Sequence, residues 1–73
     1  MAESLRGGEI GAGEFGGYQA RQYARLPGVV LSAVFDPHPE RAAAVAMPLG
    51  GRAFTDLDQF LDAVDVVTIA SRN

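Results

Sequence analysis

Two nearly continuous apolar runs dominate the pattern of hydrophobic and polar positions, VVLSAVF at residues 29–35 and DVVTIA at residues 65–70. Such runs are typical of strands that are covered on both faces of a parallel sheet. A weaker first strand is predicted in GGEIGAG, residues 7–13, because glycine and glutamate are poor strand residues. RAF, at residues 52–54, predicts a brief edge strand.

Between the first two strands, EFGGYQARQYARL at residues 14–26 predicts a helix that ends at the Pro27-Gly28 pair. Small and apolar residues recur on one face of this helix, at Gly16, Ala20, Tyr23 and Ala24.

Two shorter helices are predicted further along the chain. The alanine-rich segment ERAAAVAM, residues 40–47, follows Pro39, which suits the first position of a helix. Thr55 is expected to cap a helix in DLDQFLDA, residues 56–63, with Asp58 three residues beyond it as in a capping box.

Strands that alternate with helices over short connections predict the α/β class. We expect a partial Rossmann-type parallel sheet of strand order 3-2-1-4 with flanking helices. In such a sheet the order reverses between the first and fourth strands, and ligands bind in the crevice beyond the carboxyl ends of the strands at that reversal.

Composition then excludes several kinds of chemistry. The 73 residues include no cysteine, no lysine and a single histidine, so thiolate metal sites, Schiff-base lysines and P-loop lysines are excluded and no metal site is expected. The net charge is −3 and the arginines are scattered, which argues against a nucleic-acid partner. No apolar run approaches the roughly 20 residues that span a bilayer, so we expect no membrane partner. A cysteine-free chain fits a cytoplasmic location.

The segment IGAGEFGG, residues 10–17, carries glycines with the spacing G-x-G-x-x-G. In a dinucleotide-binding turn, Gly11 permits the tight bend, Gly13 lets the backbone approach a pyrophosphate, and Gly16 allows close packing of the helix on the sheet. The helix that begins near Glu14 would direct free N–H groups at the phosphates. Asp36 lies 20 residues beyond Gly16, directly after a predicted strand, where a carboxylate binds ribose hydroxyls. NAD is favoured over NADP because this carboxylate repels a 2′-phosphate.

Other interpretations of these residues stay open. The glycines could form only a structural turn, and Asp36 could simply begin the Asp-Pro turn. His38 is either a surface turn residue or a neighbour of the adenine pocket. Ser71 and Asn73 either donate hydrogen bonds to the cofactor or belong to a plain loop. The alternative functions are binding of S-adenosylmethionine or another nucleotide, and a non-catalytic structural or interaction module.

Beyond the glycine motif, most of the chain resembles the N-terminal domain of the Gfo/Idh/MocA oxidoreductases, the family of glucose-fructose oxidoreductase and inositol dehydrogenase. The matching segments are IGAGEFGGYQARQYARLPGVVLSAVFDPHPERAAAVA, which begins at Ile10, and AFTDLDQFLDAVDVVTIASRN, which ends at Asn73. The sequence departs from the family at Gln19, where histidine is common, at Gly7 and Glu9 in the first strand, and at SRN in place of Thr-Pro-Asn.

The resemblance implies that the chain binds NAD and that the complete family members transfer a hydride to or from a sugar or polyol. By position, the residues that it implies beside the cofactor are Gly11, Gly13, Glu14, Phe15, Asp36, Ala70, Ser71 and Asn73. Gly16 of the glycine motif and His38 of the turn complete the expected cofactor-binding set. The catalytic lysine and the substrate domain of the family would lie beyond residue 73, so residues 1–73 are expected to form a single, truncated dinucleotide-binding domain with no catalytic residue. The open edge of the last strand predicts a homodimer or a domain-swapped assembly.

Overall fold

The computed structural model describes residues 4–11, 14–23 and 25–69. Its four strands form one parallel sheet in the order β3-β2-β1-β4, which confirms the predicted class and topology. The elements in chain order are β1 (Leu5–Ile10), α1 (Glu14–Tyr23), β2 (Val29–Phe35), α2 (Pro39–Ala46), a 3₁₀ turn η1 (Met47–Leu49), β3 (Arg52–Phe54), α3 (Leu57–Asp62) and β4 (Val66–Ile69).

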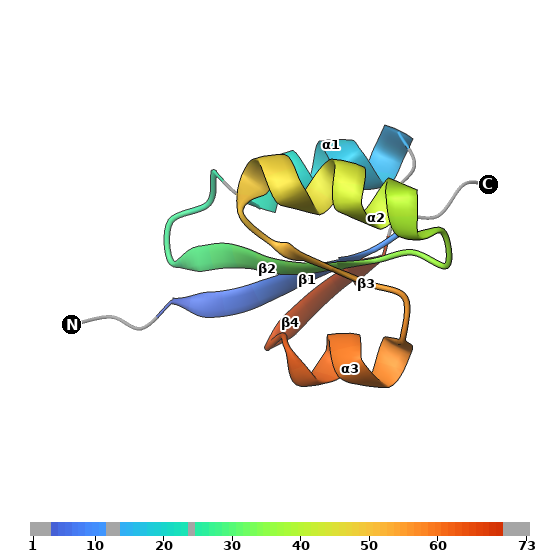
Figure 1. The fold of residues 1–73 in the computed structure, drawn as a ribbon. Coiled ribbons are helices and arrows are strands. Elements are labelled where there is room, and N and C mark those ends of the chain that lie inside the picture. The colour runs from blue at the N-terminus through green and yellow to red at the C-terminus, as the bar shows by residue number, and fades with distance from the viewer. Residues whose placement is uncertain (1–3, 12–13, 24, 70–73) are drawn as a thin grey trace.

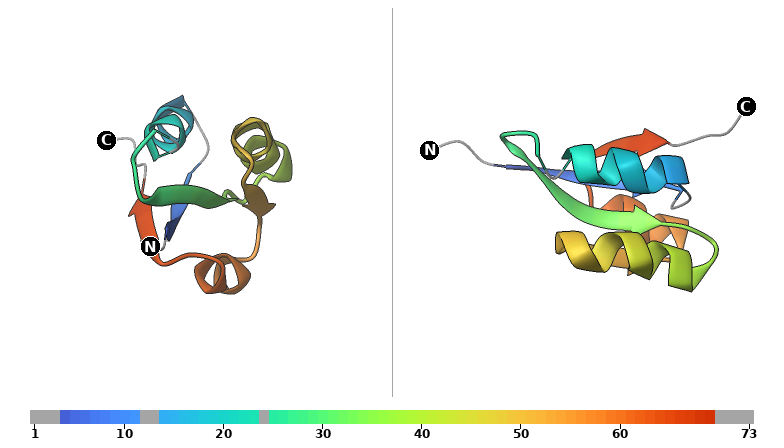
Figure 2. Two further views of the ribbon diagram at one scale, coloured as in Figure 1. Left: turned by 90° about the vertical axis from the view of Figure 1, so that its left-hand side faces the viewer. Right: turned by 90° about the horizontal axis from the view of Figure 1, so that it is seen from above.

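The helices cover the two faces of the sheet unequally. Figures 1 and 2 show α1 and α2 side by side on one face and α3 alone on the other. Within the described residues no helix is long and apolar enough to cross a membrane. The sheet with helices on both of its faces makes three layers, the arrangement in which parallel strands are ordinarily buried.

The core between the sheet and the paired helices combines branched apolar residues of β2 with small residues. Leu31 and Val34 of β2 pack there with buried alanines, and the alanines allow the helices to approach the sheet closely. The alanines of this cluster are Ala20, Ala42 and Ala46. On the opposite face, Phe60 of α3 is fully buried, with its ring 6.0 Å from that of Phe35 and 6.3 Å from that of Phe54.

The two glycines of β1 have a packing reason that the strand pattern does not show. A Cβ atom added to Gly8 would lie 2.6 Å from the Phe60 ring and 2.6 Å from the Val64 side chain. A Cβ atom added to Gly7 would lie 3.0 Å from the Tyr23 ring on the other face. The central strand therefore uses residues of low strand propensity because helices press on it from both sides.

Several element ends differ from the prediction. The first helix ends at Tyr23, before residue 26, and the second ends at Ala46 with a 3₁₀ turn after it. The prediction that Thr55 caps the third helix is wrong. Asp56 caps it instead, because its backbone is extended and its carboxylate accepts a hydrogen bond of 3.0 Å from the Gln59 N–H.

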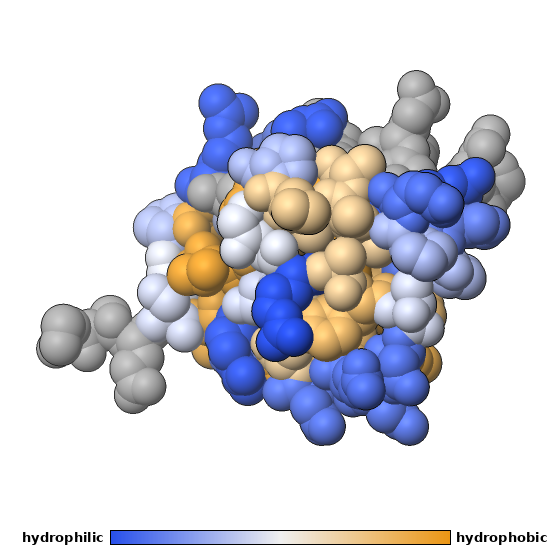
Figure 3. Space-filling view, viewed as in Figure 1, coloured by the Kyte–Doolittle hydropathy of each residue, from blue (hydrophilic) through white to orange (hydrophobic). Residues whose placement is uncertain are grey.

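The last strand is less buried than its apolar sequence suggests. Val66 and Val67 are each 37% exposed and Ile69 is 65% exposed, because β4 lies at the edge of the sheet and pairs only with β1 among the described strands. Figure 3 shows that apolar side chains are also exposed on one face of the molecule, where polar side chains surround them. The sequence pattern thus predicted the position of this strand but overestimated its burial.

An ion pair fixes the start of β4 to β1. The Arg6 guanidinium donates hydrogen bonds of 3.0 and 3.3 Å to the Asp65 carboxylate, and the Arg6 backbone N–H donates another of 2.7 Å. The hydrogen bonds from the Arg6 side chain hold the pKa of Asp65 below its usual range. Both side chains are well exposed, so this contact sets strand register more than it adds stability.

Candidate functional site

The carboxyl ends of three strands meet at one edge of the sheet. Ile10 at the end of β1 lies opposite Phe35 of β2 on one side and Ile69 of β4 on the other. The strand order reverses between β1 and β4, so this edge is the place where α/β sheets bind ligands.

Gly11 makes the bend that leaves β1. Its φ of 95° lies in the left-handed region, which strongly favours glycine, and its N–H donates a hydrogen bond of 2.8 Å to the Phe35 carbonyl. The first glycine of the motif therefore does what the spacing predicted, and the hydrogen bond ties the bend to the end of the neighbouring strand.

The helix after this bend begins at Glu14, and its first turn includes Phe15 and Gly16. The backbone of α1 thus starts directly beyond the carboxyl end of β1, where free N–H groups and the helix dipole favour an anion. Gly13 lies outside the described residues, as do Ala70, Ser71 and Asn73 after β4, so their predicted roles stay predictions.

Asp36 directly follows β2 at the same edge and is 5% exposed. Its N–H donates to the Phe54 carbonyl at 3.2 Å, which holds it against the end of β3. Its carboxylate oxygen Oδ1 accepts a hydrogen bond of 2.8 Å from the His38 N–H, and Nδ1 of the His38 ring lies 3.2 Å from the same oxygen. The turn role that the sequence left open is therefore present, and the same geometry fixes the carboxylate beside the edge.

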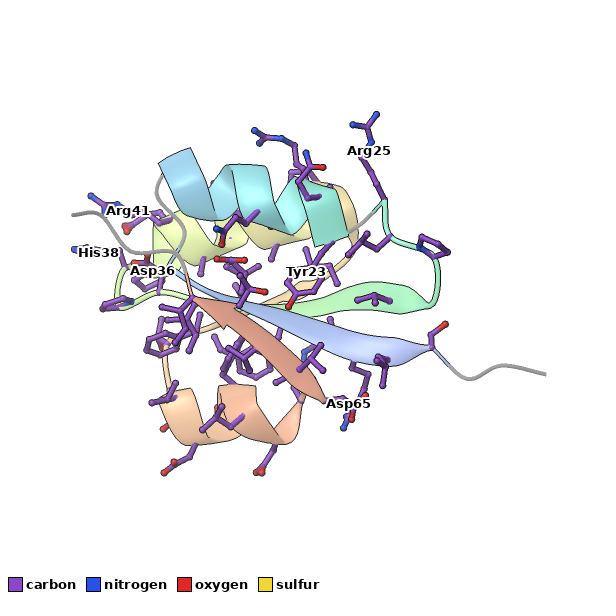
Figure 4. The ribbon with its side chains drawn as sticks, turned by 180° about the vertical axis from the view of Figure 1, so that it is seen from behind. Tyr23, Arg25, Asp36, His38, Arg41 and Asp65 are labelled. Atoms are coloured by element: carbon purple, nitrogen blue, oxygen red, sulfur yellow. The ribbon has the colours of Figure 1, made fainter. Side chains whose placement is uncertain are left out.

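Figure 4 shows Asp36, His38 and Arg41 together at one end of the molecule, with Asp65 toward the opposite end. The His38 side chain is 60% exposed, as expected of a surface turn residue, and the ring stays in contact with Asp36. Asp36 and His38 are near each other in the sequence, but no sequence signal indicates the contact between ring and carboxylate.

Tyr23, the last residue of α1, packs against the sheet. Its ring lies against Gly7, and its hydroxyl shares a hydrogen bond with the hydroxyl of Thr68 on β4. These two residues also line a hollow of about 220 Å³ between α1 and β4, together with Gln19, Gln22 and Leu26. Neither Gly11 nor Asp36 lines this hollow, so it is separate from the edge described above.

Glu9 lies in β1, in the middle of the sheet, in the strand where the sequence placed it. Its side chain has no exposed area, and both of its carboxyl oxygens are without a hydrogen-bond partner among the described residues. In the strand register it lies between Val34 and Thr68, on the face that α1 covers. Burial raises its pKa to about 8.

The described residues contain no cluster of three acidic, histidine or cysteine side chains that could hold a metal ion.

Comparisons with known proteins agree with the fold. UDP-N-acetylglucosamine 3-dehydrogenase of Acidithiobacillus ferrooxidans is 43% identical over 67 residues, which cover 92% of this chain and 21% of that protein. The crystal structure of GenD2 from gentamicin A biosynthesis, in complex with NAD, superposes with a TM-score of 0.87 at 33% identity and covers 97% of this chain and 21% of that one.

A myo-inositol dehydrogenase from Corynebacterium glutamicum, whose crystal structure has a TM-score of 0.83, is 30% identical over 94% of this chain and 21% of that one. The chain thus spans about a fifth of the length of the relatives it matches. Residues 5–73 match the family described as an oxidoreductase family with an NAD-binding Rossmann fold. The chain belongs to the Gfo/Idh/MocA oxidoreductase family, and the part it contains is the NAD-binding Rossmann fold of that family.

Proposed function

We propose that this chain binds NAD at the carboxyl edge of its sheet, as the dinucleotide-binding part of a dehydrogenase that acts on a sugar or polyol. The observation that carries the proposal is the 2.8 Å hydrogen bond from Gly11 to the last residue of β2, because it sets the glycine bend beside the strand that Asp36 follows. A backbone bend without side chains and a carboxylate at the neighbouring strand end suit the pyrophosphate and the ribose of one dinucleotide.

The roles of the residues follow from their places at this edge. The backbone of the glycine turn and the first turn of α1 would hold the pyrophosphate through N–H groups, and the Asp36 carboxylate would accept hydrogen bonds from the ribose hydroxyls. The turn and helix residues with this role are Gly11, Gly13, Glu14, Phe15 and Gly16. His38 would border the adenosine end, and Ala70, Ser71 and Asn73 would border the cofactor beyond β4.

When bound, NAD supplies the acceptor or donor of a hydride, and the protein contributes binding and orientation. The residues at the described part of this edge include no lysine, and the proposal assigns their acids and bases to cofactor binding, with Glu14 at the pyrophosphate and Asp36 and His38 at the adenosine end. We therefore propose that residues 1–73 bind the dinucleotide without turning over a substrate. The relatives are named as dehydrogenases of a nucleotide sugar and of inositol, which supports a polyhydroxylated substrate for the complete enzyme.

Titration of the chain with NADH, followed by nicotinamide fluorescence, tests the proposal. We expect a saturable change in NADH fluorescence, which competition by the non-fluorescent NAD reverses. Preferential displacement by S-adenosylmethionine would favour the alternative nucleotide ligand. A folded sample that gives no binding heat with NAD, NADP or S-adenosylmethionine in calorimetry would contradict dinucleotide binding and favour a structural module.

We also propose that two copies of this chain associate through β4. The support is the exposed edge of this strand, where Val66, Val67 and Ile69 combine apolar side chains with a backbone that pairs on one side within the described sheet. We expect size-exclusion chromatography with light scattering to give a dimer at micromolar concentration. Val67→Lys should shift the chain to monomer because a charge on an edge strand opposes pairing.

Val30→Lys is the matched control for the edge variant, because Val30 is 52% exposed and belongs to β2, which is paired on both sides. It should leave the dimer intact. A wild-type chain that runs as a monomer at micromolar concentration would contradict the association.

A further inference from the structure

Glu9 lies in β1 directly behind the bend at which the pyrophosphate is proposed to bind. Only Ile10 separates it from Gly11. The rise of a parallel strand puts the Cα atoms of Glu9 and Gly11 about 7 Å apart. α1 begins at Glu14 on the other side of the same bend. A negative charge on Glu9 would therefore act on an anion bound at this turn, against the attraction of the helix dipole.

The neighbouring strands offer Glu9 no positive charge. In the register of the sheet it lies between Val34 of β2 and Thr68 of β4, on the face that α1 covers. Valine does not ionise, and the Thr68 hydroxyl shares its hydrogen bond with the phenol of Tyr23. The Glu9 side chain has no exposed area, and neither of its carboxyl oxygens has a hydrogen-bond partner among the described residues.

The helix above Glu9 offers no positive charge on its described inner face either. Tyr23 packs on Gly7, and Gln19 precedes Tyr23 by one helical turn. Because α1 returns antiparallel to β1 to reach the parallel strand β2, Gln19 lies over Glu9. Oε1 of Gln19 is also buried without a partner among the described residues. The cation of this helix within the described side chains, Arg21, is exposed to solvent.

We propose that Glu9 couples proton binding to dinucleotide binding, so that the chain holds the pyrophosphate tightly while Glu9 is protonated and more weakly once it ionises. This inference rests on the dinucleotide function proposed above. Two unit charges about 10 Å apart at an effective dielectric constant of about 20 repel each other enough to change an equilibrium constant about tenfold. By reciprocity, a bound dinucleotide increases the proton affinity of Glu9 by the same factor, and binding takes up protons where the free chain is partly ionised.

Calorimetry of NADH binding in two buffers of different ionisation enthalpy measures this proton uptake. Burial raises the pKa of Glu9 to about 8, so the coupling is sought between pH 6.5 and pH 8.5. For the wild type we expect an uptake of about half a proton per NADH at pH 8.5 and almost none at pH 6.5. The dissociation constant should rise about threefold over the same range.

Glu9→Gln isolates the contribution of this carboxyl, because the amide does not ionise. The groups at the cofactor edge, His38 among them, are present in both proteins, so the difference in uptake between them belongs to Glu9. Glu9→Val removes the same proton and serves as a second variant. Glu40→Gln is the matched control, since it removes an exposed glutamate from α2 and should keep the uptake of the wild type.

Circular dichroism at each pH identifies the conditions in which every protein is folded, because unfolding would also weaken the apparent binding. Proton uptake in the wild type and Glu40→Gln that is lost in the Glu9 variants supports the proposal. Equal uptake in all the proteins, with NADH binding intact, overturns the coupling and leaves the proposed function in place. Absence of saturable NADH binding at pH 6.5, where Glu9 is protonated, overturns the proposed function together with this inference.

Discussion

Glu9→Val is expected to stabilise the fold by about 3 to 5 kcal/mol at pH 8 and to remove most of the dependence of stability on pH above 5. Glu9 lies in the central strand with no exposed area and no hydrogen-bond partner among the described residues. Valine has a similar volume and high strand propensity, so it fits between Val34 and Thr68 without a polar group to desolvate.

The sign of the pH effect follows from the direction in which burial moves the pKa. Burial raises the pKa of Glu9 from 4.5 to about 8 in the folded chain, so the folded state binds the proton more tightly than the unfolded state. Stability is therefore fully present below about pH 4.5 and decreases as the pH rises to about 8. A tenfold difference in proton affinity between the folded and unfolded states corresponds to about 1.4 kcal/mol, which sets the scale of the loss in the wild type.

Urea denaturation at pH 5, 6.5 and 8 measures this effect as the free energy of unfolding. Glu9→Gln should also flatten the pH dependence, because the amide does not ionise, while leaving a buried polar group that gives no gain comparable to valine. Glu40→Gln is the control, since it removes an exposed glutamate from the first turn of α2. If the wild type were equally stable at pH 5 and pH 8, the buried carboxyl would have to find a partner that the described contacts do not include.

The residues that could be predicted from sequence are those whose local chemistry determines their structure. The run at 29–35 forms β2 because β-branched residues suit a paired strand, and Gly11 forms the bend because its φ of 95° excludes most side chains. The position of Asp36 could also be predicted from local chemistry. It directly follows β2, in a turn that the neighbouring prolines and its own carboxylate define.

What could not be predicted depends on contacts between distant segments. Gly8 belongs in the strand because Phe60, more than 50 residues away in sequence, occupies the space of its missing side chain. The partnership of Tyr23 with Thr68 and the exposure of Ile69 depend likewise on where β4 lies in the sheet. The choice of Asp56 over Thr55 as the cap of α3 was a local competition between two suitable residues, which spacing alone does not resolve.

Asp36→Asn is expected to weaken NAD binding about tenfold and to leave NADP binding unchanged or stronger, so that most of the discrimination between them disappears. Hydrogen bonds to a charged acceptor exceed those to a neutral one by about 1 to 1.5 kcal/mol, which corresponds to this factor. The asparagine carbonyl can still accept the hydrogen bond from the His38 N–H, so the turn at the end of β2 is kept. Parallel calorimetric titrations with NAD and NADP measure the change.

Comparison of Asp36→Ala with Asp36→Asn separates the effect of the carboxylate charge from the effect of the turn. Alanine removes both, so it should weaken NAD binding further and also lower the free energy of unfolding by about 1 kcal/mol through loss of the hydrogen bond to His38. Asp58→Asn removes an acid from the first turn of α3 and should leave both dinucleotide affinities unchanged. Equal weakening of NAD and NADP in Asp36→Asn would contradict a contact between Asp36 and the ribose, because only the charge at the 2′ position distinguishes the two ligands there.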